Sequence, residues 1–259
     1  MFAGIDIGSS SSKAAIIGDD GRLLSVSVHN QGAGTDGHRQ ALERALALAG
    51  AERSDIRFLV ATGYGRMRYE GADRQLTEIS CHAKGVAWLT SGARTIIDVG
   101  GQDSKAIKLD AAGNVANFAM NEKCAAGTGR FLEVMARVLD CRVDELSEIA
   151  AASVKEVPIS SVCAVFAESE VISRLSSGER PEDVARGAHV SIARRIAGLA
   201  GRIGCQPEIV MTGGVALNGD AVACLSKELG HEVLVAPHAQ AIGAVGAAAF
   251  AWEMARAAK

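Results

Sequence analysis

An internal repeat is the sequence feature that most constrains the fold. Shifting the sequence by 92 positions places Ile5–Gly8 over Ile97–Gly100, and Ser12–Ala14 over Ser104–Ala106. In each copy a strand-like run is followed by a Gly-rich turn, a second strand and a polar turn, which is the pattern of a β-hairpin. The sequence therefore predicts a duplicated architecture in which each half opens with a hairpin.

Strands and helices alternate after each hairpin. We expect the first copy to continue with strands at 23–28 and 56–62 and helices at 38–49 and 79–89. The second copy is richer in helices, expected at 128–139, 144–151, 164–176, 181–203, after 214 to about 229 and from 242, with strands at 208–212 and 231–236. This alternation predicts an α/β fold with two mixed sheets, each covered by helices, and a boundary near residues 90–95.

Composition and charge argue against several functional classes. The 29 glycines and 4% aromatic residues suit a fold with many tight turns. A net charge of -3 creates no basic field for a nucleic acid or an anionic membrane surface, so neither partner is expected. The chain opens into a strand-like run rather than a signal peptide, and no apolar stretch is suited to spanning a bilayer. We therefore expect a cytoplasmic protein without a disulfide framework.

Three Gly-rich loops point to phosphate binding. The first, Asp6–Lys13, places a glycine and four serines between two strands, and its twin in the second copy is Asp98–Lys105. Backbone N–H groups in such loops can hold phosphate oxygens, and a nearby lysine adds positive charge. The third loop, Met211–Asn218, follows a strand with paired glycines against which an adenine or ribose could lie. Each loop alone could be an ordinary turn, but the three together favour a nucleotide site.

The carboxylates of the two related loops are candidates for binding Mg²⁺. Asp6, Asp98 and Asp103 offer the oxygen ligands that this hard cation prefers, directly or through water. Neither a P-loop nor a G-x-G-x-x-G motif follows the first strand. The three loops instead resemble the actin, Hsp70 and sugar-kinase superfamily, in which two duplicated lobes clamp a nucleotide. On that resemblance residues 1–92 form the first lobe with the first phosphate loop, and residues 93–259 form the second lobe.

The resemblance allows each loop residue to be assigned an expected role. The expected nucleotide residues are Asp6, Gly8, Ser9, Ser12 and Lys13 in the first phosphate loop, Asp98, Gly100, Gly101, Gln102 and Asp103 in the second, and Gly213 and Gly214 in the adenosine loop. Gln102 or Asp103 is the better candidate for positioning the attacking water, whereas Asp6 and Asp98 are expected near the metal.

Two further segments each carry a cysteine at the start of an expected helix. They are Asn121–Phe131, which contains Cys124, and Ser160–Glu170, which contains Cys163. The positive end of a helix dipole favours a thiolate at this position, and it also favours the negative charge of a reduced iron-sulfur cluster. On physical grounds alone, two buried structural cysteines explain these segments at least as well.

The residues around both cysteines narrow the functional class. KCAAGTGRF at Cys124 and SSVCAVFAESEV at Cys163 closely resemble the activators of 2-hydroxyacyl-CoA dehydratases and the ATPase subunits of benzoyl-CoA reductase. The likeness extends to ATGYGR at 61–66, to residues 78–85 and to MTGGVALN at 211–218. It implies a homodimeric or pseudo-symmetric ATPase with one [4Fe-4S] cluster between subunits. ATP hydrolysis would drive a low-potential electron, received from ferredoxin or flavodoxin, onto a partner dehydratase or reductase.

The number of thiols is consistent with that implication. A [4Fe-4S] cluster commonly takes four thiolates, and neither segment contains a C-x-x-C pair. Cys124 and Cys163 supply two per chain, so a two-fold homodimer would supply four. The other cysteines are interpreted as structural: Cys81, Cys141, Cys205 and Cys224. Both cluster segments lie in the second half, so a rotation of the halves around nucleotide could gate electron transfer.

Two other functional classes stay open at this level. A sugar kinase of the same superfamily would need a sugar-binding carboxylate as general base and would carry no cluster. An ATP-switched assembly protein of the actin type would polymerise and would not respond to an acyl-CoA system. Within the electron-donor class, the sequence does not separate a dehydratase activator from a reductase subunit, and it does not name the acyl-CoA substrate, which only the partner needs to bind.

Overall fold

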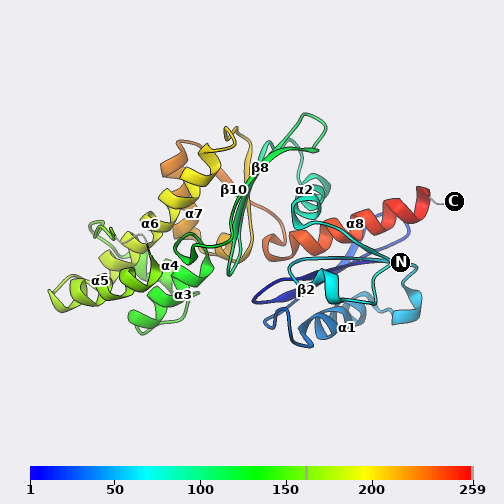
Figure 1. Cartoon of the computed structure of the whole chain (residues 1–259), viewed down its shortest axis with the longest axis horizontal. Coiled ribbons are helices and arrows are strands. Elements are labelled where there is room, and N and C mark those ends of the chain that lie inside the picture. Colours follow the sequence, from blue (N-terminus) through cyan, green and yellow to red (C-terminus); the bar gives the residue numbers. More distant parts are fainter. Residues whose placement is uncertain (161–162, 258–259) are drawn as a thin grey trace. The chain divides into compact units, whose positions relative to one another are not determined.

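The chain folds into two compact units, each built on its own sheet. The computed structural model describes residues 1–160 and 163–257 (Figure 1). The first unit comprises residues 1–93, 109–116 and those from 236 onward, and the second comprises residues 94–108 and 117–235. Within the described residues each sheet has five strands, and both mix parallel with antiparallel pairs. The expected α/β class with two mixed sheets is confirmed.

The first sheet contains the expected hairpin, which is formed by its first two strands in chain order. Its strands have the order β3-β2-β1-β4-β5 and are β1 (Phe2–Ile7), β2 (Ser12–Ile17), β3 (Leu23–His29), β4 (Phe58–Thr62) and β5 (Arg74–Gln75). Strand β1 is central, pairing antiparallel with β2 and parallel with β4. All six of its residues are buried, which is the burial expected of a strand covered on both faces.

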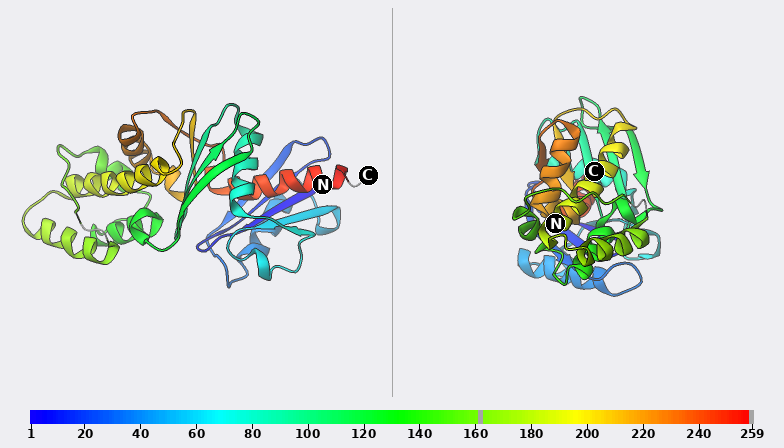
Figure 2. Two further views of the ribbon diagram at one scale, coloured as in Figure 1. Left: turned by 45° about the horizontal axis from the view of Figure 1, so that its top comes forward. Right: turned by 90° about the vertical axis from the view of Figure 1, so that its left-hand side faces the viewer.

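Helices cover both faces of this sheet. Helix α1 (Gly37–Ala49) places Ala41, Leu42, Ala45 and Leu46 against one face, in a core shared with alternate residues of β1 and β2. Helices α2 (Glu78–Leu89) and α8 (Ile242–Ala257) contact each other, and α8 runs along the other face (Figure 2). Gly4 makes this contact close, because a Cβ there would lie 2.1 Å from the carbonyl oxygen of Ala244.

The position of α8 differs from the expected division of the chain. The sequence-based expectation places residues 93–259 as a whole in the second lobe, whereas α8 packs on β1 and α2 of the first unit. The physical reason is its burial: Ile242 through Ala249 are all buried, so this helix needs apolar partners around most of its circumference. The first sheet and α2 provide them.

The second sheet repeats the topology of the first. Its strands have the order β10-β9-β6-β7-β8 and are β6 (Thr95–Val99), β7 (Ser104–Leu109), β8 (Val115–Asn121), β9 (Ile209–Thr212) and β10 (Val233–Val235). Strands β6 and β7 form the second expected hairpin, while β9 pairs parallel with both β6 and β10. Strand β8 was not expected, because its residues are mostly exposed and lack a clear apolar alternation.

Helices account for most of the second unit. They are α3 (Gly129–Val138), α4 (Leu146–Ala151), α5 (Ala164–Ser176), α6 (Pro181–Gly201) and α7 (Gly219–Leu229). Helix α6 begins with Pro181 at its first turn, followed by Glu182 and Asp183, and both the fixed φ of proline and the acidic charges favour a helix start. It contacts α3, α4, α5 and α7, so it is the central helix of this unit.

Among residues 1–160 and 163–257, none of the helices is both long enough and apolar enough to cross a membrane.

Candidate functional site

The first Gly-rich loop is a tight connection between β1 and β2. Gly8 donates its backbone N–H to the carbonyl of Ser11 at 3.1 Å. Asp6 and Lys13 face each other across the hairpin, with Lys13 Nζ 3.7 Å from Asp6 Oδ2 and both side chains largely buried. Ser12 is fully buried and donates its hydroxyl to the carbonyl of Gln31 at 2.8 Å, while Ser9 is half-buried. The loop therefore joins a buried charge pair to a partly accessible backbone.

The second loop reproduces this arrangement between β6 and β7. Gly100 donates its N–H to the carbonyl of Asp103 at 3.0 Å, the counterpart of the bond in the first loop. Lys105 Nζ lies 3.1 Å from Asp98 Oδ2 and 2.7 Å from Asp103 Oδ2. The Lys105 side chain is only 2% exposed, so its ion pairs are shielded from water. Gly101 is half-buried and Gln102 is exposed at the tip of the turn.

The third loop lies beside the second. Gly213 follows β9 with φ +86°, and a Cβ there would meet the carbonyl oxygen of Val99 at 2.3 Å and Asp98 Oδ1 at 2.9 Å. Thr212 donates its hydroxyl to Asp98 Oδ1 at 2.9 Å. Gly214 is exposed and begins the short 3-10 helix Gly214–Leu217. The fold thus brings two of the expected loops together at the carboxyl ends of neighbouring parallel strands, a common place for ligands in α/β folds.

The segment that carries Cys124 is hydrogen-bonded to the second loop. Helix α3 starts at Gly129, whose N–H donates to the carbonyl of Gly100 at 2.8 Å, and Arg130 N–H donates to Gly101 at 3.0 Å. Cys124 is exposed five residues before that start, and Asn121 holds its backbone through bonds to both its N–H and its carbonyl. A displacement of the second loop would therefore act directly on the chain next to Cys124.

Cys163 occupies a similar place before another helix. It is exposed and stands at the N-cap of α5, as the sequence predicts. Two residues of the matched segment, Ser161 and Val162, lie outside the described residues. Helices α3 and α5 contact each other, so the two cysteine segments belong to one part of the second unit. Among residues 1–160 and 163–257, no three His, Cys, Asp or Glu side chains gather into a metal site.

The other cysteines have the surroundings of structural thiols. Burial raises the pKa of Cys81 to about 12 and that of Cys224 to about 11. Cys141 and Cys205 are half-buried, and burial raises the pKa of each thiol above its ordinary value. A thiol that resists deprotonation is a poor metal ligand, because the thiolate is the form that binds. These four environments contrast with the exposure of Cys124 and Cys163.

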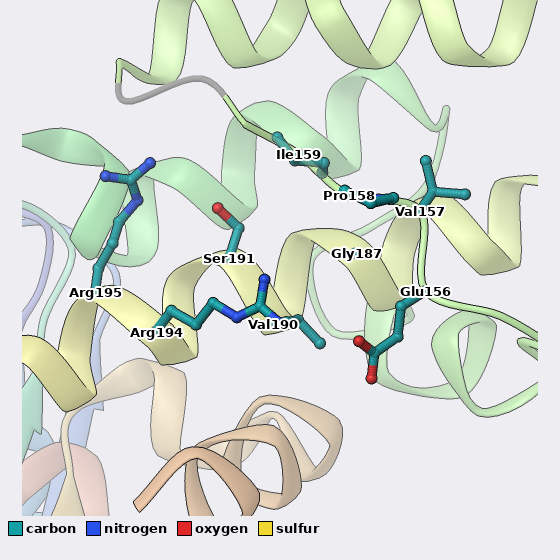
Figure 3. Close-up of a pocket in the computed structure, with 9 residues that line it drawn as sticks. All are labelled: Glu156, Val157, Pro158, Ile159, Gly187, Val190, Ser191, Arg194 and Arg195. Carbon is teal, nitrogen blue, oxygen red and sulfur yellow. The ribbon is translucent and has the colours of Figure 1, made fainter.

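A cavity of about 230 Å³ lies behind the chain that leads to Cys163. It is lined by Glu156, Val157, Pro158 and Ile159 on one side and by Gly187, Val190, Ser191, Arg194 and Arg195 of α6 on the other. Figure 3 shows Ser191 on α6 pointing toward the segment that carries Ile159. Gly187 allows α6 and the segment that contains Val157 to approach each other closely, because a Cβ at this position would lie 1.9 Å from the carbonyl oxygen of Val157.

Sequence reasoning missed two groups of polar residues near the loops. Asp6 is enclosed by Gly63 and Gly243, and a Cβ on Gly243 would lie 3.0 Å from Asp6 Oδ2 and 3.1 Å from His82 Nε2. A second group, next to the third loop, is buried: His189, Asn218 and Asp220. His189 is 29 residues from Asn218 in the sequence, and only the acceptor character of Asn218 as a helix N-cap could have been read from the sequence.

Comparison with known proteins gives a consistent result across the whole chain. The profile of the BadF/BadG/BcrA/BcrD ATPase family matches residues 3–251. The activator of lactoyl-CoA dehydratase from Anaerotignum propionicum is 51% identical over 253 residues, covering 98% of each protein. The structure of the activator of the 2-hydroxyisocaproyl-CoA dehydratase from Clostridium difficile, with bound ADPNP, has a TM-score of 0.96 at 47% identity, covering 100% of this chain and 97% of that one.

A more distant structure shares only the fold. A ROK family glucokinase from Streptomyces griseus, in complex with glucose and AMPPNP, has a TM-score of 0.59 at 16% identity, covering 97% of this chain and 99% of that one. The resemblance expected from the three loops and the two cysteine segments is confirmed by the family match and by the identity of the relatives. The chain belongs to the BadF/BadG/BcrA/BcrD ATPase family.

Proposed function

We propose that this protein is the ATP-hydrolysing activator of a 2-hydroxyacyl-CoA dehydratase, to which it donates a low-potential electron. The observation that carries the proposal is the connection between a Gly-rich loop and an exposed thiol: α3, which follows Cys124, donates backbone hydrogen bonds to Gly100 and Gly101. Such a connection can link the state of a bound nucleotide to the geometry of a redox centre. Relatives at 47–51% identity that are named activators of such dehydratases support the same conclusion.

The nucleotide would be held by the three loops. We assign Asp6, Gly8, Ser9, Ser12 and Lys13 to one phosphate group, Asp98, Gly100 and Gly101 to another, and Gly213 and Gly214 to adenosine. Gln102 or Asp103 would position the attacking water. The half-buried backbone at Ser9 and Gly101 and the exposed backbone at Gly214 support these roles, since N–H groups there can reach a ligand.

The donor set fits Mg²⁺. Asp98 and Asp103 together carry one more negative charge than the Lys105 ammonium group that they share, so this position attracts a further cation, and carboxylate oxygens suit Mg²⁺. Asp6 makes a similar pair with Lys13 in the first loop. When bound, the metal would neutralise phosphate charge during hydrolysis. The carboxylates of Asp6 and Asp98 would hold the metal, directly or through water, in a largely buried site.

The exposed thiols fit one [4Fe-4S] cluster shared by two copies of the chain. Each copy offers Cys124, five residues before α3, and Cys163, at the N-cap of the adjacent helix α5, and four thiolates meet the usual requirement of the cluster. Val165 and Phe166 follow Cys163 and are 67% and 69% exposed. Large exposed apolar side chains beside a ligand favour contact with another protein surface, and a second copy is the simplest one. The cluster would supply the one-electron chemistry.

The proposal is tested by the metal content of the protein. Wild type and the variants Cys124→Ala and Cys163→Ala are purified without oxygen and analysed for iron and sulfide, with electron paramagnetic resonance after reduction. About four irons per dimer are expected in wild type, and loss of the signal in both variants. Cys141→Ala is the matched control, since its thiol is half-buried and should not bind iron.

The same measurement separates the proposal from its main competitor. A colourless wild type that hydrolyses ATP and stays colourless after reconstitution would remove the electron-donor function and favour a small-molecule kinase. We further propose ferredoxin or flavodoxin as the reductant, which is checked by cluster reduction with either protein in place of dithionite. An ATPase subunit of a benzoyl-CoA reductase would instead pass its electron to that enzyme rather than to a dehydratase.

A further inference from the structure

A buried hydrogen-bond relay lies directly behind the candidate adenosine loop. His189 of α6 is fully buried, and its Nδ1 lies 2.6 Å from Asp220 Oδ2 of α7. Asn218, which ends the loop that starts at Gly213, places its Nδ2 3.0 Å from His189 Nε2. Arg186 of α6 pairs with the other oxygen of Asp220 at 3.0 Å. The imidazole is thus held between a carboxylate and a side-chain amide.

The role of Asn218 as a helix cap determines how the amide is oriented. Asn218 Oδ1 accepts the backbone N–H of Ala221 at 2.9 Å and so caps α7. Reversing the amide would place its N–H groups against that N–H donor, which is unfavourable. The amide nitrogen therefore faces His189, and it can only donate. His189 Nε2 must then accept, so the ring is neutral and carries its proton on Nδ1, where it donates to Asp220.

The relay ties the third loop to the most buried helix of the unit. Asn218 connects the third loop to α7, because it directly follows the 3-10 helix Gly214–Leu217 and also caps α7. Asp220 adds a link to α4, since its N–H donates to Ser147 Oγ at 3.0 Å. Among the described residues, the charged or titratable groups that contact the ring or its carboxylate partner include Arg186 from α6 and Asp220 and Cys224 from α7, with Cys224 Sγ 3.9 Å from Asp220 Oδ2. A satisfied buried network of this kind holds one backbone geometry.

We infer that His189 is a positioning residue for nucleotide binding, which holds the loop Gly213–Asn218 in its adenosine-binding geometry through its neutral, Nδ1-protonated ring. The inference rests on the proposed assignment of this loop to adenosine. His189 does not touch the ligand. Its effect is transmitted through Asn218. A change at His189 should therefore alter the binding of the nucleoside part of the ligand and leave the binding of the phosphates unchanged.

The first test compares ADP with inorganic pyrophosphate by titration calorimetry of the full-length protein purified without oxygen. His189→Leu removes the hydrogen bonds that the ring makes with Asn218 and Asp220, and it should weaken ADP binding about tenfold, the effect of a lost buried hydrogen bond. Pyrophosphate binding should not change. His189→Gln keeps one donor and one acceptor and should recover most of the ADP affinity. Val184→Ala is the matched control, because it removes buried volume from α6 without touching the relay.

The second test measures which ring nitrogen of His189 carries the proton. Two-bond proton–nitrogen NMR spectra should show His189 protonated on Nδ1 alone in wild type. Asn218→Asp keeps the cap oxygen but turns the donor into a carboxylate oxygen, so both ring nitrogens should then carry a proton. A wild-type ring protonated on Nε2 alone would overturn the relay.

The outcomes separate this inference from the proposed function. If wild type binds neither ADP nor pyrophosphate, the nucleotide assignment itself fails, and the inference with it. If wild type binds ADP and His189→Leu binds it equally well, only the inference is overturned. Equal losses of ADP and pyrophosphate affinity in His189→Leu, or a tenfold ADP loss in Val184→Ala, would indicate general damage and would also overturn it.

Discussion

At Gly213 the backbone leaves no room for a side chain. The residue has φ +86°, and the carbonyl oxygen of Val99 lies 2.3 Å from where a Cβ would be. Two separate costs follow, one from the backbone conformation and one from the steric contact with β6. Gly178 has nearly the same φ, +88°, but no atom lies within 4 Å of its Cβ position. Of these two glycines, only Gly213 adds crowding to a positive φ.

We expect Gly178→Ala to lower the free energy of unfolding by about 1–2 kcal/mol, the cost of a positive φ for an L-residue. Gly213→Ala should cost more, because the third loop must also move away from Val99, and ADP affinity should fall at least tenfold. Urea unfolding and ADP titration of both variants check this. Equal losses of stability together with unchanged ADP binding in Gly213→Ala would contradict the assigned role of this loop.

At the scale of elements, Asp183 joins the start of α6 to the chain before the cavity. The residue is fully buried, and its Oδ1 accepts the backbone N–H groups of Val154 and Lys155 at 2.8 and 3.1 Å. Burial by itself raises the pKa of this carboxyl, but the two backbone donors, together with the positive charges of Arg180 and Lys155, leave the pKa below its ordinary value. A carboxyl with a lowered folded-state pKa stabilises the fold above its unfolded pKa, and this contribution is lost as pH falls through the folded value.

Asp183→Asn should therefore destabilise the protein at pH 7, where the charged form makes the stronger hydrogen bonds. The stability difference from wild type should shrink as the pH is lowered below about 4, the ordinary pKa of aspartate, because wild type loses its advantage there. Urea unfolding at pH 7, 5 and 3 measures the difference. Asp20→Asn, at an exposed carboxylate, serves as the control. A difference that stays constant over this range would show that ionisation of Asp183 does not contribute.

At the scale of the whole molecule, the proposed cluster makes function depend on a second copy. Two cysteines per chain are half of a usual ligand set, and the exposed Phe166 lies three residues after Cys163. Introducing a charge at a tightly packed apolar contact disfavours association, because the charge loses its hydration without gaining a partner. Dimerisation and cluster content should therefore change together.

Phe166→Glu should shift the protein from dimer to monomer in anaerobic sedimentation and should lower its iron content. Leu48→Glu is the control, because Leu48 is similarly exposed, at 62%, but lies on α1 of the other unit. It should remain dimeric and keep its iron. A Phe166→Glu protein that stays dimeric with full iron content would place the shared cluster away from α5.

Local features were determined by the sequence alone. The two hairpins follow from the repeat, and their register brings Asp6 opposite Lys13 and Asp98 opposite Lys105. The expected helix at 164–176 matches α5 in both bounds. These features depend on residues close together in the chain, where turn residues and apolar periodicity act directly. The residues around Cys124 and Cys163 likewise indicate the family without any knowledge of tertiary contacts.

Contacts between distant segments were decided only by the tertiary structure. Helix α8 packs on β1 because its apolar surface needs a large partner, and its sequence does not say which sheet provides it. His189 meets Asn218 and Asp220 only because α6 and α7 pack together. A lone histidine in a helix has many compatible environments, and its hydrogen-bonding partners and the position of its proton follow from which side chains the packing brings within reach.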